Sequence, residues 1–280
     1  MTDVIIDALL DALKVLPFLF GAYLLIEYLE HKAGGKMTDR LRHLGPAGPL
    51  AGALLGAVPQ CGFSVTAANF YSGRLISVGT LVAVFLSTSD EAVPILLAEP
   101  QAFSHVIKLL GVKLIIAFAA GLGADLLYRL FGKKQEEPFA DLCRHCHCEH
   151  GNIWRSALHH TVRIFLFLLA INLLLGLGLY FIGDEAVGRV FLENSFWQPF
   201  LTALLGFVPN CAASVLITKL YLTGALSFGS AVAGLCTGAG LGLAVLLKTN
   251  HRPKENALII VGLYAVAVAS GLLLNAIGIL

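Results

Sequence analysis

The chain alternates long apolar stretches with short polar ones over its whole length. A helix that spans the hydrocarbon core of a bilayer needs about 20 apolar residues, and stretches of that length recur along the chain. The pattern therefore predicts an all-α, polytopic membrane protein. The apolar segments cover residues 4–29, 46–72, 75–98, 103–131, 161–182, 199–222, 225–247 and 257–280.

The second half of the chain repeats the first at an offset of 150 residues, without a gap. Residues 56–61 read Gly-Ala-Val-Pro-Gln-Cys, and residues 206–211 read Gly-Phe-Val-Pro-Asn-Cys. The register continues beyond this motif, since Ser64 matches Ser214 and Tyr71 matches Tyr221. Duplicated apolar segments that are interrupted at matching places are typical of secondary transporters. We expect membrane repeat 1 over 1–131, a cytosolic linker over 132–157 and membrane repeat 2 over 158–280.

Composition agrees with a membrane protein. Hydrophobic residues make up 57% of the chain and charged residues 13%, and the mean hydropathy is +0.81. Soluble proteins carry roughly 25% charged residues, so most of this surface must face lipid. The net charge of +1 argues against a nucleic-acid-binding protein, because no basic domain is present to neutralise phosphates.

The distribution of charge predicts the topology, because basic loops prefer the cytoplasm. Loops 30–45, 129–155 and 248–254 are basic, whereas loops 99–105 and 183–196 are acidic. Three full crossings between the first two basic loops would place one of them on the wrong side. The conflict disappears if residues 46–72 form a re-entrant hairpin that enters and leaves through the same face.

The lengths of the hairpin arms agree with this interpretation. Arms 47–58 and 61–72 each have 12 residues, which is about 18 Å of helix. That length reaches only the middle of a core of about 30 Å. Residues 199–222 would form the second hairpin. Each repeat then crosses three times, so the second repeat is inverted and the two hairpin tips meet near the midplane.

Polar residues at the hairpin tips are the first candidate ligands. Pro59 and Pro209 have no N–H to donate and end the first arms. Irregular backbone at membrane depth is tolerated only where it lines a cavity or is buried in protein. The alternative is that the Cys and Ser residues only allow close helix packing. The candidates are Gln60, Cys61, Ser64 and Asn69 in the first hairpin and Asn210, Cys211 and Ser214 in the second.

A polar run interrupts the apolar segment 75–98. It contains Ser87, Ser89, Asp90 and Glu91. A carboxylate near the bilayer centre costs about 2.5–3.5 kcal/mol on insertion scales, so it requires a cation, a proton or a basic partner. Lys113 is the candidate charge partner, and a purely structural ion pair is the alternative. The equivalent region of repeat 2 has no acid but contains Cys236 and Thr237, so the repeats are not equivalent.

A third cluster lies in the predicted cytosolic linker, where three thiols and three imidazoles fall within eight residues. Soft and borderline metals prefer these ligands, so the pattern indicates metal affinity. A polar linker without a metal is the alternative. Outside the membrane the cluster would act as a sensor, a delivery site or a docking point. Its residues are Cys143, His145, Cys146, His147, Cys148 and His150.

Together these motifs resemble the ten-transmembrane-helix heavy-metal exporters, whose members are labelled arsenic efflux proteins or manganese transporters. The resemblance rests on Pro-Gln-Cys-Gly-Phe-Ser at 59–64, Ser-Thr-Ser-Asp-Glu-Ala at 87–92, the Cys/His-rich linker and the second Pro-Asn-Cys at 209–211. It covers nearly the whole chain. Counting each hairpin arm as a helix gives six plus four, consistent with ten.

The sequence thus predicts a multi-pass transporter of the prokaryotic inner membrane rather than an enzyme. It would export a metal or metalloid ion, Mn²⁺ or a soft species such as arsenite, in exchange for protons. The chain has no phosphate-binding loop signature, so it does not use ATP itself. The expected partners are lipid, the ion and protons, with no prosthetic group; a homodimer stays open. The alternatives are a small-anion carrier, a membrane-embedded thiol oxidoreductase and a metal sensor.

Overall fold

The computed structural model consists of α-helices joined by short turns, with no strand in the part of the chain that it describes. The predicted all-α class is therefore confirmed there. Most of the predicted linker, including the whole Cys/His cluster at 143–150, lies outside the described residues. The structure describes residues 13, 16–17, 19–21, 23–24, 47–89, 92–98, 103–131, 154, 157–159, 161–167, 169–170, 173 and 196–278.

Four helical segments in this part of the chain are long and apolar enough to cross a membrane. Large aliphatic side chains such as Ile115 and Leu258 are exposed on the long helices, as expected where lipid surrounds a helix. The polytopic prediction is therefore supported. The segments are Val78–Leu97, His105–Leu130, Phe228–Thr249 and Pro253–Ile277.

Five helices of the first half recur in the second half at the 150-residue offset. The first set is α3 (Ala47–Gly56), α4 (Cys61–Ser72), α5 (Val78–Ser87), α6 (Ala92–Ala98) and α7 (Phe103–Phe131). The second set is α10 (Gln198–Gly206), α11 (Cys211–Leu222), α12 (Phe228–Thr237), α13 (Leu241–Thr249) and α14 (Pro253–Ile277). Helices α4 and α5 correspond residue for residue to α11 and α12.

Helices α3 and α4 form one helix–turn–helix hairpin, and α10 and α11 form the other. Each turn contains the proline of its Pro-Xaa-Cys motif, and each second arm begins at the cysteine. Helix α3 ends at Gly56, two residues before the predicted arm end, because the residue preceding a proline is disfavoured in helical conformation. Asn210 caps α11 by accepting a hydrogen bond from the N–H of Ala212 at 2.8 Å.

The two ends of the second hairpin are tied together by Gln198, which is buried at the start of α10. Its Nε2 donates to the carbonyl of Ala225 at 2.8 Å, and its Oε1 accepts from the N–H of Ser227 at 3.1 Å. Both partners lie just beyond the end of α11. The hairpin therefore starts and finishes at the same place.

The segments predicted as single crossings at 75–98 and 225–247 are both broken. Helix α5 ends at Ser87, and Pro94 lies in the first turn of α6, where proline costs no helical hydrogen bond. Helix α12 ends at Thr237, and Gly240 takes a positive φ of 53° before α13. Both segments were predicted as single crossings, so these breaks are a finding of the structure.

Within each repeat, glycines bring the long helix against its neighbour. A Cβ placed on Gly121 of α7 would lie 2.7 Å from the Gly79 carbonyl oxygen of α5. A Cβ on Gly271 of α14 would lie equally close, 2.7 Å, to the Gly229 carbonyl oxygen of α12. Each repeat therefore contains the same tight seam, in which the backbones of the two helices are in contact. Asp125 reinforces the first seam through the N–H of Gly79 at 2.7 Å.

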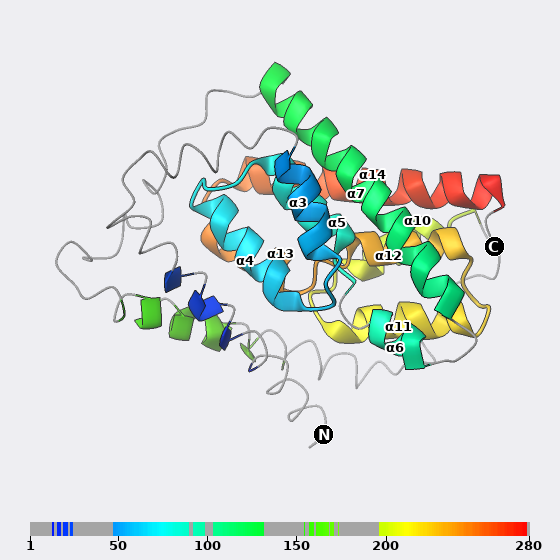
Figure 1. The fold of residues 1–280 in the computed structure, drawn as a ribbon, viewed down its shortest axis with the longest axis horizontal. Helices are drawn as coiled ribbons and strands as arrows, with labels where there is room; N and C mark the ends of the chain where they lie inside the picture. The colour runs from blue at the N-terminus through cyan, green and yellow to red at the C-terminus, as the bar shows by residue number, and fades with distance from the viewer. Residues whose placement is uncertain are drawn as a thin grey trace.

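Between the repeats, the second arm of each hairpin packs against the helix that follows the break in the other repeat. Helix α4 packs on α13, α11 packs on α6, and α5 meets α12 in the middle. Figure 1 shows α4 in cyan beside α13 in orange, and α11 in yellow beside α6. The orientation of the repeats relative to a membrane, and hence their inversion, stays a prediction.

Candidate functional site

Both broken helices end beside the side chain of Lys113, which extends from α7 and is only 1% exposed. Its Nζ donates to the carbonyl of Thr88, the residue that follows α5. It also donates to the carbonyl of Leu235, in the last turn of α12, at 2.7 Å. One ammonium group therefore joins the C-terminal end of α5 in repeat 1 to the C-terminal end of α12 in repeat 2.

The charge at this junction has a simple cause. The carbonyl groups in the last turn of a helix lack helical partners and carry a partial negative charge. Helices α5 and α12 bring two such ends together in the protein interior. A buried cation is favoured there because the carbonyl oxygens replace the water it has lost. The junction is thus built to hold positive charge.

Hydroxyl groups surround the ends of both helices. Ser87, Ser89 and Thr237 are each at most 2% exposed. Ser87 donates to the Val84 carbonyl at 3.1 Å, and Ser89 donates to the Ser87 carbonyl at 3.1 Å. Because these hydroxyl protons are already used locally, the oxygen lone pairs remain as acceptors. Asp90 and Glu91 follow directly in the sequence and lie outside the described residues.

Thr237 serves packing as well as the site. Its Oγ1 donates to the carbonyl of Ala203 in α10 at 2.7 Å, and it also lies 3.0 Å from the Gly234 carbonyl. This bond attaches the first arm of the second hairpin to the end of α12. Gly206 lies against the same residue and leaves no room for a side chain. These contacts give Thr237 a part in the packing of α10 on α12, and its predicted role as an ion ligand stays a prediction.

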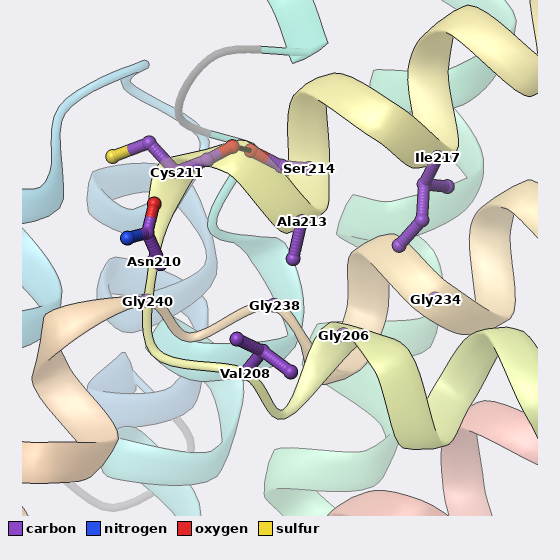
Figure 2. A pocket seen from close by; sticks show the side chains of 10 residues that line it. All are labelled: Gly206, Val208, Asn210, Cys211, Ala213, Ser214, Ile217, Gly234, Gly238 and Gly240. Atoms are coloured by element: carbon purple, nitrogen blue, oxygen red, sulfur yellow. Dashed lines mark hydrogen bonds between the residues drawn. The ribbon is translucent and has the colours of Figure 1, made fainter. Parts of the chain in front are cut away.

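A small pocket opens beside the second hairpin tip, with about 270 Å³ of empty volume that includes space at its mouth. Asn210 and Cys211 lie at one end, and the apolar Ala213 and Ile217 lie at the other (Figure 2). Ser214 also lines it and donates its hydroxyl to the Cys211 carbonyl at 2.8 Å. The remaining lining residues are Gly206, Val208, Gly234, Gly238 and Gly240.

The first hairpin tip has the same chemistry but tighter surroundings. Gln60 precedes α4 in extended conformation without a side-chain cap bond, and α4 begins at Cys61, whose side chain lies outside the described part. Ser64 is fully buried under Gly242 of α13, where an added Cβ would lie 2.7 Å from the Ser64 Cβ. At the position equivalent to Gly242, repeat 1 carries Ala92.

Asn69 lies away from the other predicted ligands. It is eight residues beyond Cys61, or about 12 Å along α4. Its Oδ1 accepts from the Tyr23 hydroxyl at 2.9 Å, and its Nδ2 donates to the Val65 carbonyl at 3.1 Å. Both hydrogen-bonding ends of the amide are thus used in joining α4 to the segment around residue 23. Its contacts give it a structural role.

The thiols differ in their exposure. Cys236 is fully buried in α12, whereas Cys211 is partly exposed at the pocket. Among the described residues, no group of three or more His, Cys, Asp or Glu side chains gathers in one place. The described polar groups around the junction are carbonyl and hydroxyl oxygens together with single thiols.

Sequence reasoning missed the backbone part of the site. The carbonyl groups of Thr88 and Leu235 give no signal in the residue types, because every residue carries one. The glycines of the second break, Gly238 and Gly240, gave a signal of flexibility, and they line the pocket. The equivalence of the two helix ends could have been inferred from the 150-residue register, which pairs Ser87 with Thr237.

The fold is that of a polytopic α-helical membrane protein with a buried polar junction between its two repeats. The family described as "Putative, 10TM heavy-metal exporter" matches residues 1–181 and 169–279. The chain belongs to this family, and the resemblance noted in the sequence is confirmed. Comparisons with curated proteins and with solved structures gave no significant match.

Proposed function

We propose that the protein is a secondary-active exporter that binds a metal cation between its two repeats. The observation that carries this proposal is the position of Lys113. A positive charge is held by carbonyl groups from the ends of both broken helices, in the interior of a membrane protein. The same carbonyl oxygens could coordinate a metal cation once the tethered Lys113 side chain moves aside.

The groups around this position can supply metal ligands. Carbonyl oxygens and the hydroxyls of Ser87 and Ser89 suit a hard ion, and the carboxylates of Asp90 and Glu91 follow in the chain. A site of this kind favours Mn²⁺. The thiols of Cys61, Cys211 and Cys236 would instead favour soft ions or arsenite. Mn²⁺ is the first candidate because oxygen donors outnumber thiols around the junction.

The proposed transport step uses the two hairpins. In a re-entrant hairpin both ends lie at one face of the membrane, and the Gln198 tie at the mouth of the second hairpin supports this arrangement. The tips would reach the midplane from opposite faces, as in other transporters with inverted repeats. One repeat then rocks against the other and opens the site to each side in turn. The basic loops would face the cytoplasm of a prokaryotic cell.

The coupling is proposed to be an exchange for protons. The chain carries no nucleotide-binding signature, so the energy must come from an ion gradient. The Cys/His cluster at 143–150 would deliver the ion from the cytosol to the membrane part. Both statements extend the family assignment, which supports metal export without specifying the ion.

Flux into proteoliposomes tests the proposal. Wild-type protein should move Mn²⁺ in response to a pH gradient, and chelation of the metal should stop the flux. Lys113→Met and Asp90→Asn should each lower the flux at least tenfold. Lys108→Gln, on the exposed side of the same helix α7, is the matched control and should retain it.

Other outcomes would contradict the proposal. Full Mn²⁺ flux in Lys113→Met would show that the junction is not the cation site. Flux of Cd²⁺ or arsenite without Mn²⁺, abolished by Cys211→Ser, would assign transport to the thiols. Transport that is indifferent to chelators would instead favour an anion carrier, which could use the N-terminal helix ends at the hairpin tips and Lys113.

A further inference from the structure

Two tyrosines at equivalent positions of the repeats each reach across to the other repeat. Tyr71, near the end of α4, donates its hydroxyl to Glu255 Oε2 in the first turn of α14 at 3.2 Å. Tyr221, near the end of α11, shares a hydrogen bond with His105 Nδ1 near the start of α7. The acceptor positions are also equivalent, because residues 105 and 255 are 150 apart.

Both contacts lie far from the central junction. Each tyrosine is ten residues beyond the cysteine that begins its helix, or about 15 Å along the axis. The contacts therefore join the repeats at the open ends of the two hairpins. If the hairpins enter from opposite faces, as proposed above, the Tyr71 contact lies at one face and the Tyr221 contact at the other.

The contact at Glu255 is part of a charged network. Arg74 Nη1 lies 3.0 Å from Glu255 Oε2, and Arg252 Nη1 lies 3.1 Å from Glu255 Oε1. Arg74 also donates through Nη2 to Asn250 Oδ1 at 3.3 Å, and its guanidinium lies 5.1 Å from the centre of the Tyr71 ring. The turn after α4 is thus bound to the start of α14 by several charged and polar groups.

A second bond runs beside this network between the same two repeats. Ser72 Oγ and Thr249 Oγ1 lie 2.7 Å apart, which joins the end of α4 to the end of α13. The ion pair is well shielded from solvent, since the side chain of Arg74 is 4% exposed and that of Glu255 is 22% exposed. Charge-assisted hydrogen bonds are roughly twice as strong as neutral ones.

Arg74 holds its place at a conformational cost. Its φ is 59°, in the left-handed region, where a residue with a Cβ is strained. The equivalent residue of repeat 2 is Gly224, with a φ of 77°, which takes this conformation without strain. Backbone strain of this kind is retained where the side chain is needed. The side chain needed here is the partner of Glu255.

The contact at His105 is much simpler. It consists of the hydrogen bond to Tyr221 and an edge-on ring contact with centroids 5.6 Å apart. The Tyr221 ring also lies 5.9 Å from the Phe228 ring, which belongs to the same repeat. Gly224 has no side chain, so repeat 2 cannot contribute an equivalent of the Arg74 ion pair. The two ends of the molecule are therefore closed by contacts of unequal strength.

We infer that Tyr71–Glu255 and Tyr221–His105 are the two gate contacts of the transport cycle, one at each face, and that they open in alternation. This inference rests on the proposed function, because it assigns the contacts that rocking must break. When one repeat rotates against the other about the central junction, contacts at one end separate while those at the other end close. The Tyr221–His105 gate opens more readily, since no ion pair joins the described residues on its two sides.

The test measures access to Cys211, which is partly exposed at the pocket beside the second hairpin tip. The full-length chain keeps Cys211 as its only thiol, with the other five cysteines replaced by alanine. A membrane-impermeant maleimide is applied to right-side-out and to inside-out vesicles. The labelling rate from each side reports how often that side opens, and no transported ion is needed.

The variants remove one hydroxyl at a time. Tyr221→Phe should raise the labelling rate about two- to tenfold from one side only, as expected for the loss of one hydrogen bond. Tyr71→Phe should raise it by a similar factor from the opposite side. Without either change, labelling should be faster from the side on which Tyr221→Phe acts. The basic loop 248–254 predicts that the Tyr71 side is cytosolic.

Two further variants address the charged network. Glu255→Gln should act from the same side as Tyr71→Phe and more strongly. Arg74→Gly removes the ion pair while introducing the residue that repeat 2 carries, so it relieves strain and preserves the fold. Tyr264→Phe is the control. The Tyr264 hydroxyl donates to the carbonyl of Phe200 at 3.3 Å within repeat 2, so its loss should not affect labelling from either side.

The inference is overturned if the Tyr71 and Tyr221 variants increase labelling from the same side. It is equally overturned if Arg74→Gly and both tyrosine variants elute from a sizing column as folded protein but are labelled at the same rate as the parent from both sides. Failure of the proposed function looks different: labelling would alternate between sides as expected, but no metal would cross in the flux assay. Metal flux together with labelling that increases from one side only would instead support the exporter and refute the two gate contacts.

Discussion

A single added methyl group should destabilise the protein more in the tight seam between α5 and α7 than on the open face of α7. Gly121→Ala places a Cβ 2.7 Å from the Gly79 carbonyl oxygen, 2.9 Å from the Pro49 Cβ and 3.0 Å from the Ala83 Cβ. The first of these neighbours is backbone and cannot rotate away. Gly111→Ala, ten residues earlier on α7, meets nothing within 4 Å.

The expected difference follows from the packing alone. Alanine is favoured over glycine in a helix by about 1 kcal/mol, and this gain is common to both variants. Overpacking a close contact costs about 1–3 kcal/mol, and only Gly121→Ala carries this cost. We therefore expect Gly121→Ala to be about 1–3 kcal/mol less stable than Gly111→Ala, a factor of five or more in the unfolding equilibrium.

Unfolding in mixed micelles titrated with SDS and followed by circular dichroism measures this difference. Repeat 2 offers an independent copy of the experiment, because Gly271→Ala meets the Gly229 carbonyl at 2.7 Å while Gly262→Ala meets nothing within 4 Å. Equal stability of the seam and open-face variants in both repeats would refute the backbone contact. A cost in only one repeat would show that the seams are not equivalent.

Three other results are expected. Asp125→Ala should destabilise the protein by about 1–3 kcal/mol in the same assay, because it leaves the Gly79 N–H without its acceptor, whereas Asp125→Asn, the residue type that repeat 2 carries there, should cost much less. A double-mutant cycle of Tyr23→Phe and Asn69→Leu should give a coupling of about 0.5–1.5 kcal/mol, and no coupling would contradict the buried hydrogen bond. Replacing the three cysteines of 143–150 by serine should remove a metal-binding event in calorimetry and lower the initial rate of flux in proteoliposomes at low metal concentration; an unchanged rate would contradict the proposed delivery role.

The sequence predicted the positions of the two helix–turn–helix pairs because their determinants are local, whereas their re-entrant path through a membrane stays a prediction. Proline removes an N–H donor wherever it stands, and the paired Pro-Xaa-Cys motifs mark where α4 and α11 begin. The gap-free register then transferred each boundary from one repeat to the other. The break after Thr237 was missed because glycine permits a break without requiring one. The helix stops there because Gly240 adopts a positive φ.

The contacts between the repeats could not be predicted from the residue types. Lys113 was identified as a charge partner, but the carbonyls that hold it belong to helix ends brought together by the tertiary fold. Asn69 was expected among the ligands because of its polarity, and its actual partner, Tyr23, lies in a different helix. Such pairings depend on which faces meet, and a single sequence does not contain that information.

The difference between Gly242 and Ala92 bears on why a duplicated protein should not be perfectly symmetric. Because Gly242 has no side chain, α13 packs closely against Ser64 and holds the first hairpin in position. The corresponding Ser214 borders open space instead. One hairpin can therefore serve as the frame and the other as the moving part. Unequal halves allow the two faces of the protein to open at different rates, whereas the direction of net movement is set by the gradients across the bilayer.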